Sequence, residues 1–208
     1  MKISKVEKVK FRKGMFKISF ENSKKSLAIS ADSIVKFTLK IGVDISEDVC
    51  KRILFYDKSK SGIFKALSLV SKRSYSVKNL QNKLIQRGYG LKNSVGVVER
   101  LKELNYLNDE EYAKNYAVYL SGIGKGEFLI RAELEKQGIE RSLINSALGV
   151  VKASVETSDK IAEILKAKFK NFDKKNKIEV RKATSFFLRR GFSFEDIAKA
   201  FKLCRSVM

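Results

Sequence analysis

Residues 129–151 read LIRAELEKQGIERSLINSALGVV: a helical pattern of apolar residues, a glycine, and a second helical pattern. The same layout occurs in residues 79–101 (NLQNKLIQRGYGLKNSVGVVERL) and in residues 182–201 (KATSFFLRRGFSFEDIAKAF). The three glycines, Gly88, Gly138 and Gly191, are 50 and 53 residues apart, at the upper edge of the periods of helical repeats. This spacing predicts a tandem helical repeat.

Apolar positions match in all three copies when the copies are aligned on their glycine. The position four residues before the glycine is Leu84, Leu134 and Phe187 in the three copies, and the position eight residues before it is Leu80, Ile130 and Ala183. The residue directly after the glycine is Tyr89, Ile139 and Phe192. Offsets of four and eight residues fall on one face of a helix. An apolar residue directly after a left-handed glycine is typical of a helix C-terminus. We therefore expect each glycine to end a helix with one buried face.

Residues 3–29 differ from the rest because their apolar residues alternate with polar ones. Alternation predicts two or three short strands, which need a covering helix. Residues 31–40 supply the candidate, with Ile34, Val35, Thr38 and Leu39 as its apolar stripe. Ser46 is expected to begin a further helix.

From about residue 58 the pattern is helical throughout. Ser76 is expected to cap the second helix of the first repeat, Asp109 to cap the first helix of the second, and Ser158 to begin the third. The predicted fold is mainly α, an elongated curved array of three tandem three-helix repeats preceded by a β-strand and helix extension. Its predicted parts are the extension (residues 1–57) and repeats 1 (58–108), 2 (109–157) and 3 (158–208).

The net charge is +21, from 44 Lys and Arg against 23 Asp and Glu. A charge this large favours polyanionic partners, nucleic acid or an anionic membrane surface, although a genome-wide preference for lysine would also raise it. Residues 1–108 contain 24 basic and 9 acidic side chains, residues 109–157 contain 6 and 8, and residues 158–208 contain 14 and 6. Because a genome-wide bias would be spread evenly, this uneven distribution favours basic surfaces in repeats 1 and 3.

The chain has no histidine and no proline. Without histidine it lacks the usual general base and the commonest metal ligand, so we expect no catalytic, metal or cofactor site and no enzyme activity. Cys50 and Cys204 have no CxxC partner, so buried free thiols in a reducing cytoplasm are expected. No apolar run reaches transmembrane length, and we expect a cytoplasmic protein without a membrane segment.

Two features admit both a structural and a functional interpretation. Tyr112, Tyr116 and Tyr119 follow at helical spacing, which favours core packing over a base-stacking platform. In residues 168–182, basic residues interleave with Phe169 and Phe172, which fits a solvated loop and a phosphate-contacting segment equally well.

Four stretches, in this order, resemble successive signatures of the RecX family of RecA regulators: SYSVKNLQNKLIQRG (74–88), ERLKELNYLNDEEYAKNYA (99–117), GKGEFLIRAELEKQGI (124–139) and FFLRRGFSFEDI (186–197). The resemblance runs from about residue 60 to the end. The N-terminal strands and helix are similar to the extension of longer family members. Two residues depart from the family pattern at helix starts: Asn79, where an acid is usual, and Glu127, where proline is common.

The resemblance implies a monomeric, non-enzymatic modulator in DNA repair, homologous recombination and the SOS response. Family members bind the RecA-DNA filament and reduce its ATPase, strand-exchange and co-protease activities. The expected partners are the RecA filament and single- or double-stranded DNA. The residues expected to face filament or DNA are Lys72, Arg73, Lys78, Lys83, Arg87, Lys125, Arg131, Lys174, Lys175, Lys177, Arg181, Lys182, Arg189 and Arg190. The alternative is a DNA- or RNA-binding protein that acts through basic surfaces alone.

Overall fold

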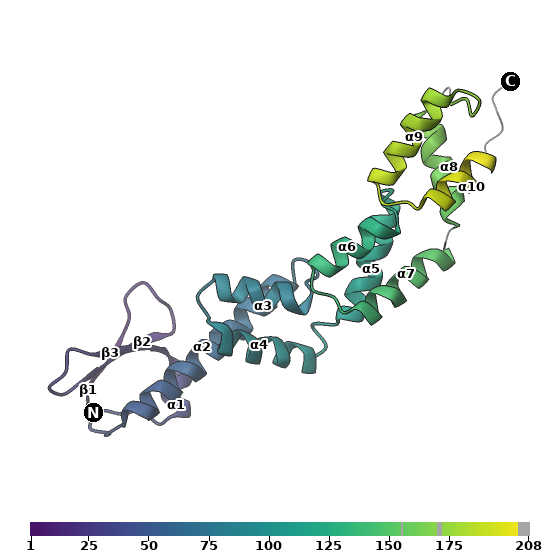
Figure 1. Cartoon of the computed structure of the whole chain (residues 1–208). Helices are drawn as coiled ribbons and strands as arrows, with labels where there is room; N and C mark the ends of the chain where they lie inside the picture. Colours follow the sequence, from purple (N-terminus) through teal and green to yellow (C-terminus); the bar gives the residue numbers. More distant parts are fainter. Residues whose placement is uncertain (155, 170–171, 204–208) are drawn as a thin grey trace. The chain divides into compact units, whose positions relative to one another are not determined.

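The computed structural model describes residues 1–154, 156–169 and 172–203. Three strands and ten helices occur within these residues, and Figure 1 shows them along the chain. They form two compact units, Met1–Arg73 with Leu80–Tyr106, and Ser74–Asn79 with Leu107–Met208. The predicted mainly α fold with an N-terminal β extension is confirmed.

The N-terminal sheet is antiparallel and its strands follow the chain order β1, β2, β3. These are β1 (Ile3–Lys8), β2 (Met15–Phe20) and β3 (Ser26–Ser30). One face is buried: Ile3, Ile18 and Ile29 are inaccessible to solvent and pack with Cys50 and Ile53 of the second helix. The alternating pattern therefore predicted the strands correctly.

The first helix, α1 (Ala31–Lys36), is shorter than the helix predicted over residues 31–40. The chain leaves the helix at Phe37, and Thr38 then adopts a left-handed φ of 51°. The predicted apolar stripe is therefore interrupted, with Leu39 buried but Val35 79% exposed. The next helix also packs against the sheet, through Cys50 and Ile53.

The second helix, α2 (Glu47–Val70), spans residues 57 and 58, the predicted boundary between the extension and repeat 1. The sequence predicted separate helices on either side of that point, but one 24-residue helix runs through it. The Asp57 carboxylate accepts hydrogen bonds from Ser30 Oγ (2.5 Å) and Ser33 Oγ (2.6 Å), which ties the middle of α2 to the extension. With no proline to end it, the helix serves the extension and the first repeat together.

The remaining helices of the first unit are α3 (Val77–Gln86), whose first turn belongs to the second unit, and α4 (Leu91–Glu103). Gly62 brings α2 close to α4, because a Cβ at Gly62 would lie 2.8 Å from Val97 Cγ2. Leu80, Leu84 and Leu101 are buried, as the repeat pattern predicted for the first two.

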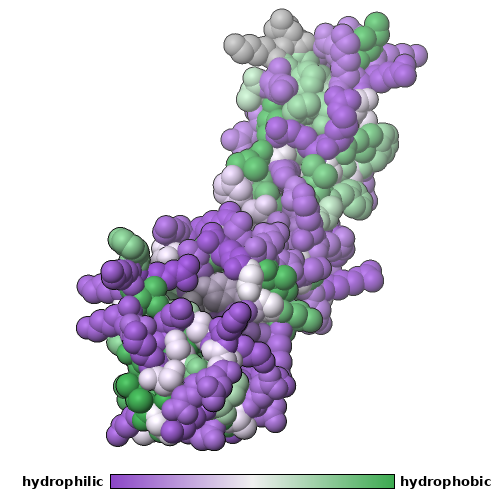
Figure 2. Space-filling view, turned by 90° about the vertical axis from the view of Figure 1, so that its left-hand side faces the viewer, coloured by the Kyte–Doolittle hydropathy of each residue, from purple (hydrophilic) through white to green (hydrophobic). Residues whose placement is uncertain are grey.

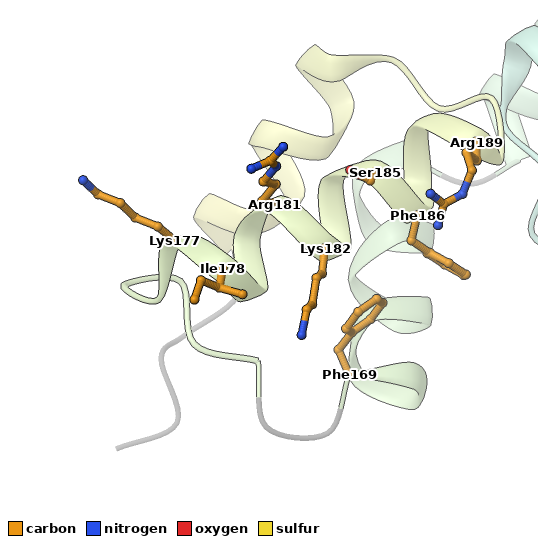
Figure 3. A pocket seen from close by; sticks show the side chains of 8 residues that line it. All are labelled: Phe169, Lys177, Ile178, Arg181, Lys182, Ser185, Phe186 and Arg189. Atoms are coloured by element: carbon orange, nitrogen blue, oxygen red, sulfur yellow. The ribbon is translucent and has the colours of Figure 1, made fainter.

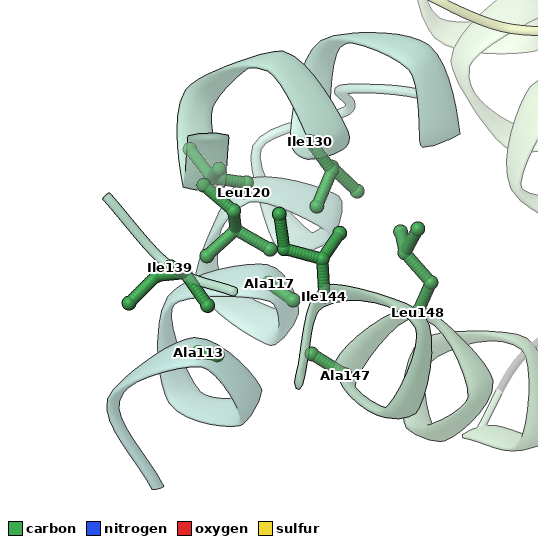
Figure 4. Close-up of a cluster of buried hydrophobic side chains, with 9 residues drawn as sticks. Ala113, Ala117, Leu120, Ile130, Ile139, Ile144, Ala147 and Leu148 are labelled. Carbon is green, nitrogen blue, oxygen red and sulfur yellow. The ribbon is translucent and has the colours of Figure 1, made fainter. Parts of the chain in front are cut away.

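The core of the second repeat lies among α5 (Asp109–Gly122), α6 (Glu127–Lys136) and α7 (Arg141–Ser154). Figure 4 shows its apolar side chains meeting from the three helices and the connection after α6. They are Ala113, Ala117, Leu120, Ile130, Leu134, Ile139, Ile144, Ala147 and Leu148. The small alanines of α5 permit close packing with α7.

The third repeat contains α8 (Thr157–Lys168), α9 (Lys177–Arg189) and α10 (Phe194–Leu203). Phe187 is fully buried at its centre and forms edge-on contacts with Phe186 and Phe192 at centroid distances of 5.2 and 5.7 Å. The Asn176 side chain accepts hydrogen bonds from the first-turn amides of α9 and so fixes where that helix begins.

All three repeat glycines end a helix, as predicted, with φ of 85° (Gly88), 80° (Gly138) and 83° (Gly191). Each turn has the same two backbone hydrogen bonds. The glycine amide donates to the carbonyl three residues back, and the next amide donates to the carbonyl five residues back. This pair defines a Schellman motif, which satisfies carbonyls that the helix end leaves unpaired.

The first turn of α3 packs against the turn after α6, inside the second unit. Ser76 Oγ donates to the Gln137 carbonyl (2.7 Å) and accepts from the Asn79 amide, which confirms the predicted cap. The Asn79 side-chain amide also donates to Gln137 Oε1. We call Ser76, Asn79 and Gln137 the Ser76 contact.

Asp109 has a different role from the predicted one. Asn108 caps α5, because its side-chain oxygen accepts from the Glu110 and Glu111 amides at 3.0 and 3.1 Å. The Asp109 carboxylate instead accepts from the Val77 amide (2.9 Å), at the start of α3. Adjacent residues therefore cap two different helices.

The start of α6 packs against the turn after α9 in the corresponding way. The Gly126 amide donates to the Arg190 carbonyl (2.8 Å), and the Phe128 amide donates to the Gly191 carbonyl (3.0 Å). We call Gly126, Phe128, Arg190 and Gly191 the Gly126 contact. Gly138 and Gly191 therefore each end a helix. The N-terminus of the second helix of the preceding repeat, α3 or α6, packs against the turn that each glycine forms.

Cys50 is a buried free thiol, as expected, and burial raises its pKa. Cys204 lies outside the described residues. None of the described helices combines the length and apolar character that a membrane span requires.

Candidate nucleic-acid interface

A basic hollow of about 670 Å³ lies along α9. Figure 3 shows the side chains that line it, all but one of them from that helix. They are Phe169, Lys177, Ile178, Arg181, Lys182, Ser185, Phe186 and Arg189. We call this set the α9 hollow. It brings together four of the predicted residues, Lys177, Arg181, Lys182 and Arg189.

The helical repeat explains why these residues share one surface. Residues 177, 181, 185 and 189 are spaced by four, as are residues 178, 182 and 186, so they form two adjacent rows on one face of α9. Ala183 and Phe187 point to the opposite side and are fully buried. The core therefore fixes the rotation of α9, and this rotation exposes its cations.

The cations of the hollow have no carboxylate partner among the described residues. The acid nearest to them on the helix, Glu179, accepts a hydrogen bond from the Asp173 amide (2.7 Å). Lys177 stands in the first turn, where a positive charge is unfavourable to the helix dipole. This concentration of positive charge opposes helix stability and favours an anionic ligand.

The aromatic part of the hollow is occupied mainly by intramolecular contacts. Phe169 and Phe186 meet edge-on at 5.6 Å. The Lys168 ammonium and the Arg190 guanidinium lie 4.8 and 5.1 Å from the Phe186 ring centre. Because cations already lie over the Phe186 ring, the hollow suits phosphate contacts better than base stacking at that ring.

Three other predicted residues of the second unit are engaged within the protein. Lys125 pairs with Glu133 (3.0 Å), and Arg131 pairs with Glu127 (3.3 Å). Arg190 donates to the Ile123 and Gly124 carbonyls at 3.2 and 3.1 Å, at the C-terminus of α5. A cation is favourable at a helix C-terminus, so this arginine stabilises the junction between α5 and α9.

Glu127, the residue that departs from the family pattern, also pairs with Lys152 (2.8 Å). The hydrogen bond from Lys152 holds the pKa of the Glu127 carboxyl below its ordinary value, and Arg131 adds to this effect. The cations near α6 are therefore partly neutralised, in contrast to those of the α9 hollow.

The remaining predicted residues of the second unit are exposed. The Lys78 stem lies against Gly138, where an added Cβ would be 2.7 Å from Lys78 Cβ. Lys175 precedes α9, and Lys174 lines a second hollow of about 440 Å³ between α9 and α10, with Phe194 and Phe201 among its apolar residues.

In the first unit, Lys72, Arg73 and Arg87 are exposed and Lys83 is half-buried. Lys72 and Arg73 follow the end of α2, and Lys83 and Arg87 lie at the C-terminal end of α3. That these residues face the filament or DNA stays a prediction. Figure 2 shows that hydrophilic side chains dominate the face in view, with hydrophobic residues scattered between them.

The three tyrosines of α5, predicted either to pack in the core or to stack on bases, differ in their burial. Tyr112 and Tyr116 are partly buried against the core of the second repeat. Tyr119 is 59% exposed and lies parallel to Tyr116, with ring centres 6.2 Å apart. Core packing therefore accounts for two of the three rings.

Sequence reasoning missed Ile178, Ser185 and Phe186 as lining residues. Their spacing from Arg181 and Lys182 in units of four could have identified them. The described residues contain no cluster of three or more His, Cys, Asp or Glu that could bind a metal ion.

Comparison with known proteins identifies relatives along most of the chain. Residues 108–148 match the family model described as RecX, second three-helix domain. The chain is 32% identical over 186 residues to "Regulatory protein RecX" of Bacillus licheniformis, covering 87% of this chain and 69% of that protein. It is 33% identical over 144 residues to the protein of that name from Legionella pneumophila strain Corby, covering 68% and 93%.

Solved structures share the fold. "Crystal structure of regulatory protein RecX" superposes with a TM-score of 0.70 at 22% identity and covers 97% of this chain and 98% of its own. The RecX structure from Lactobacillus salivarius superposes with a TM-score of 0.62 at 23% identity and covers 71% and 97%.

Proposed function

Because the chain belongs to the RecX family, we propose that it regulates a RecA-type recombinase, mainly as an inhibitor, by binding the recombinase filament on DNA. The relatives are named regulatory proteins, which supports a non-enzymatic role. The observation that carries the proposal at the residue level is the α9 hollow, whose cations have no carboxylate partner among the described residues.

The α9 hollow would act on the DNA part of the filament. Arginine guanidinium groups bind phosphate oxygens through two parallel hydrogen bonds, and Arg181 and Arg189 stand two helical turns apart on one face. Each phosphate that they neutralise releases condensed counterions, so binding weakens steeply as salt rises. A protein held along the filament would thereby slow its ATPase, strand-exchange and co-protease activities.

The direct test measures the DNA-dependent ATPase of the cognate recombinase on single-stranded DNA. Wild-type protein at substoichiometric ratio should lower turnover. The double variant Arg181→Gln and Arg189→Gln should need roughly thirtyfold more protein for the same inhibition, because two lost charged hydrogen bonds at about 1 kcal/mol each cost about 2 kcal/mol in total.

A matched control removes the same charge elsewhere in the second unit. Lys136→Gln with Arg141→Gln replaces two exposed cations of the second repeat. This variant should inhibit like wild type. Unchanged turnover with wild-type protein would contradict the proposed function, and equal losses in both variants would remove the α9 hollow from the interface.

Direct nucleic-acid binding without a recombinase is the second candidate, favoured by the same cations. Affinity for bare duplex should then fall with salt at a log-log slope of roughly −0.9 per phosphate contact. The additional variant Arg181→Gln, Lys182→Gln and Arg189→Gln should flatten this slope by two to three contacts. A wild-type slope near zero would exclude this candidate.

We further propose that the protein acts in the cytoplasm as a monomer without a cofactor. A RecA-type partner places the activity where chromosomal DNA is accessible. Light scattering on the purified protein tests the monomer directly, and a mass of twice the chain's 23.6 kDa would contradict it.

A further inference from the structure

The hairpin between β1 and β2 ends in two consecutive tight turns. The Arg12 amide donates to the Val9 carbonyl (3.3 Å), and the Met15 amide donates to the Arg12 carbonyl (3.1 Å). The third position of each turn has a left-handed backbone, with φ of 68° at Phe11 and 77° at Gly14. Glycine or asparagine is the usual residue at such a position, and Gly14 fits this rule.

Phe11 breaks the rule without any packing in return. A bulky side chain at positive φ is strained, and the surrounding fold normally compensates for such strain. Here the ring is fully exposed, at 105% of its reference area, so it contributes nothing to a core. A strained backbone that holds an aromatic ring in solvent points to an external ligand for the ring.

The charges around the ring identify the chemistry of that ligand. Lys10, Arg12 and Lys13 flank Phe11 and form no ion pair among the described residues. The acid nearest in sequence, Glu7, is paired with Lys5 at 2.7 Å. The tip therefore presents one apolar ring inside a cluster of unneutralised cations.

We propose that the tip of the β1–β2 hairpin is a contact site for single-stranded nucleic acid. Phe11 stacks on an unpaired base, and Lys10, Arg12 and Lys13 contact the phosphates beside that base. Duplex bases are already stacked on each other and leave no face for the ring. A lone exposed ring buries too little apolar area to anchor the protein in a lipid surface. This site lies in the extension and is independent of the α9 hollow and of any recombinase.

The absence of tryptophan from the chain permits a direct test. The variant Phe11→Trp places the only indole at the tip, and the matched variant Phe64→Trp places it on α2, where Phe64 is 68% exposed. Addition of an oligo-dT strand should quench Phe11→Trp saturably and leave Phe64→Trp unchanged. If fluorescence anisotropy shows that the strand binds but the Phe11→Trp fluorescence is not quenched, the proposal is overturned. Equal quenching by a duplex would overturn it as well. A blue shift with phosphatidylglycerol vesicles but no response to oligo-dT also overturns it, in favour of a membrane contact.

A second variant removes the Phe11 ring without lowering the stability of the fold. Asparagine tolerates the left-handed backbone, so Phe11→Asn should unfold at the same temperature as wild type or higher. Its affinity for oligo-dT should fall roughly tenfold, within the range for losing one base-aromatic stack. The control Phe64→Ala should bind like wild type. Wild-type affinity for oligo-dT in Phe11→Asn overturns the proposal. This binding experiment contains no recombinase, so its outcome does not depend on the outcome of the ATPase test of the proposed function.

Discussion

The Ser76 contact and the Gly126 contact occupy equivalent places in the repeat but are built from different atoms. The Ser76 contact uses side-chain donors: Ser76 Oγ donates to the Gln137 carbonyl, and the Asn79 side-chain amide donates to Gln137 Oε1. The Gly126 contact uses backbone amides and carbonyls, with the Arg190 side chain added at its edge. The same geometry is therefore reached once through hydroxyl and amide groups and once through close approach of two main chains.

The difference shows what each glycine does. A Cβ at Gly88 would meet nothing within 4 Å, so this glycine serves only its own turn. A Cβ at Gly138 would lie 2.7 Å from Lys78 Cβ, so it would clash with the base of that side chain. A Cβ at Gly191 would lie 2.5 Å from the Leu129 backbone nitrogen, which cannot move aside independently. The three glycines share one φ but differ in the space around them.

The largest effect is expected for Gly191→Ala. Left-handed strain of about 1 to 2 kcal/mol adds to a backbone clash of about 1 to 3 kcal/mol, so the loss of unfolding free energy should be about 3 kcal/mol. Urea denaturation followed by circular dichroism measures it. A loss below that of Gly88→Ala would contradict the backbone contact.

Gly126→Ala isolates the steric part of that effect. Gly126 has an ordinary φ of −84°, yet its Cβ would meet the Gly191 carbonyl and the Phe192 nitrogen. We expect a loss of about 2 kcal/mol from the clash alone. Native-state hydrogen exchange at the Phe128 amide should accelerate in this variant, whereas an unchanged rate would show that the contact survives.

Ser76→Ala should have an intermediate effect on the side-chain contact. It removes the cap of α3 and leaves the Gln137 carbonyl without its Ser76 donor. The expected loss is about 2 kcal/mol by urea denaturation. Ser76→Thr retains the hydroxyl and is the control; if both substitutions cost the same, crowding at this fully buried site is responsible rather than the hydrogen bonds.

Gly88→Ala should cost about 1 kcal/mol, because only backbone strain is added. Gly88→Asn should cost less, since asparagine accepts a positive φ more readily than alanine. The difference between these two denaturation midpoints measures the strain by itself, and identical midpoints would show that the turn relaxes.

The smallest effect concerns Glu127 at the start of α6. Its folded pKa is lowered by Lys152, so its stabilisation is present above the unfolded pKa near 4.5 and is lost as pH falls through the folded value. Since the Glu127 side chain is 37% exposed, Glu127→Gln should cost only about 0.3 kcal/mol at pH 7. Denaturation midpoints of the two proteins should converge in acid, and a gap that widens there would reverse the assignment.

Local patterns in the sequence predicted the helix stops well, because a Schellman turn depends on residues within six positions of its glycine. Longer-range details were beyond such patterns. Asn108 and Asp109 are both good caps, and only the fold shows that Asp109 serves α3 rather than α5. The Asp57 carboxylate ties the middle of α2 to Ser30 and Ser33, which lie 27 and 24 residues away in the sequence.

The candidate site was predictable to the same extent. Arg181 and Arg189 are eight residues apart and therefore lie on one face of a helix, and the α9 hollow contains both. The adjacent arginines 189 and 190 are chemically alike, yet Arg190 bonds to carbonyls more than 60 residues away. The two departures at helix starts, Asn79 and Glu127, both have partners in the fold, which local capping rules could not reveal.

The main-chain construction of the Gly126 contact bears on how this part of the protein tolerates mutation. Amides and carbonyls are common to every residue, so the contact itself requires glycine at positions 126 and 191 but no particular side chain. Charges on the outer faces of α6 and α9 can then change sign without loosening the docking of the two helices. The atoms that hold α6 against α9 are therefore different from the exposed side chains that would bind a ligand. The surface of α9 can change to suit a different polyanion while the contact is kept.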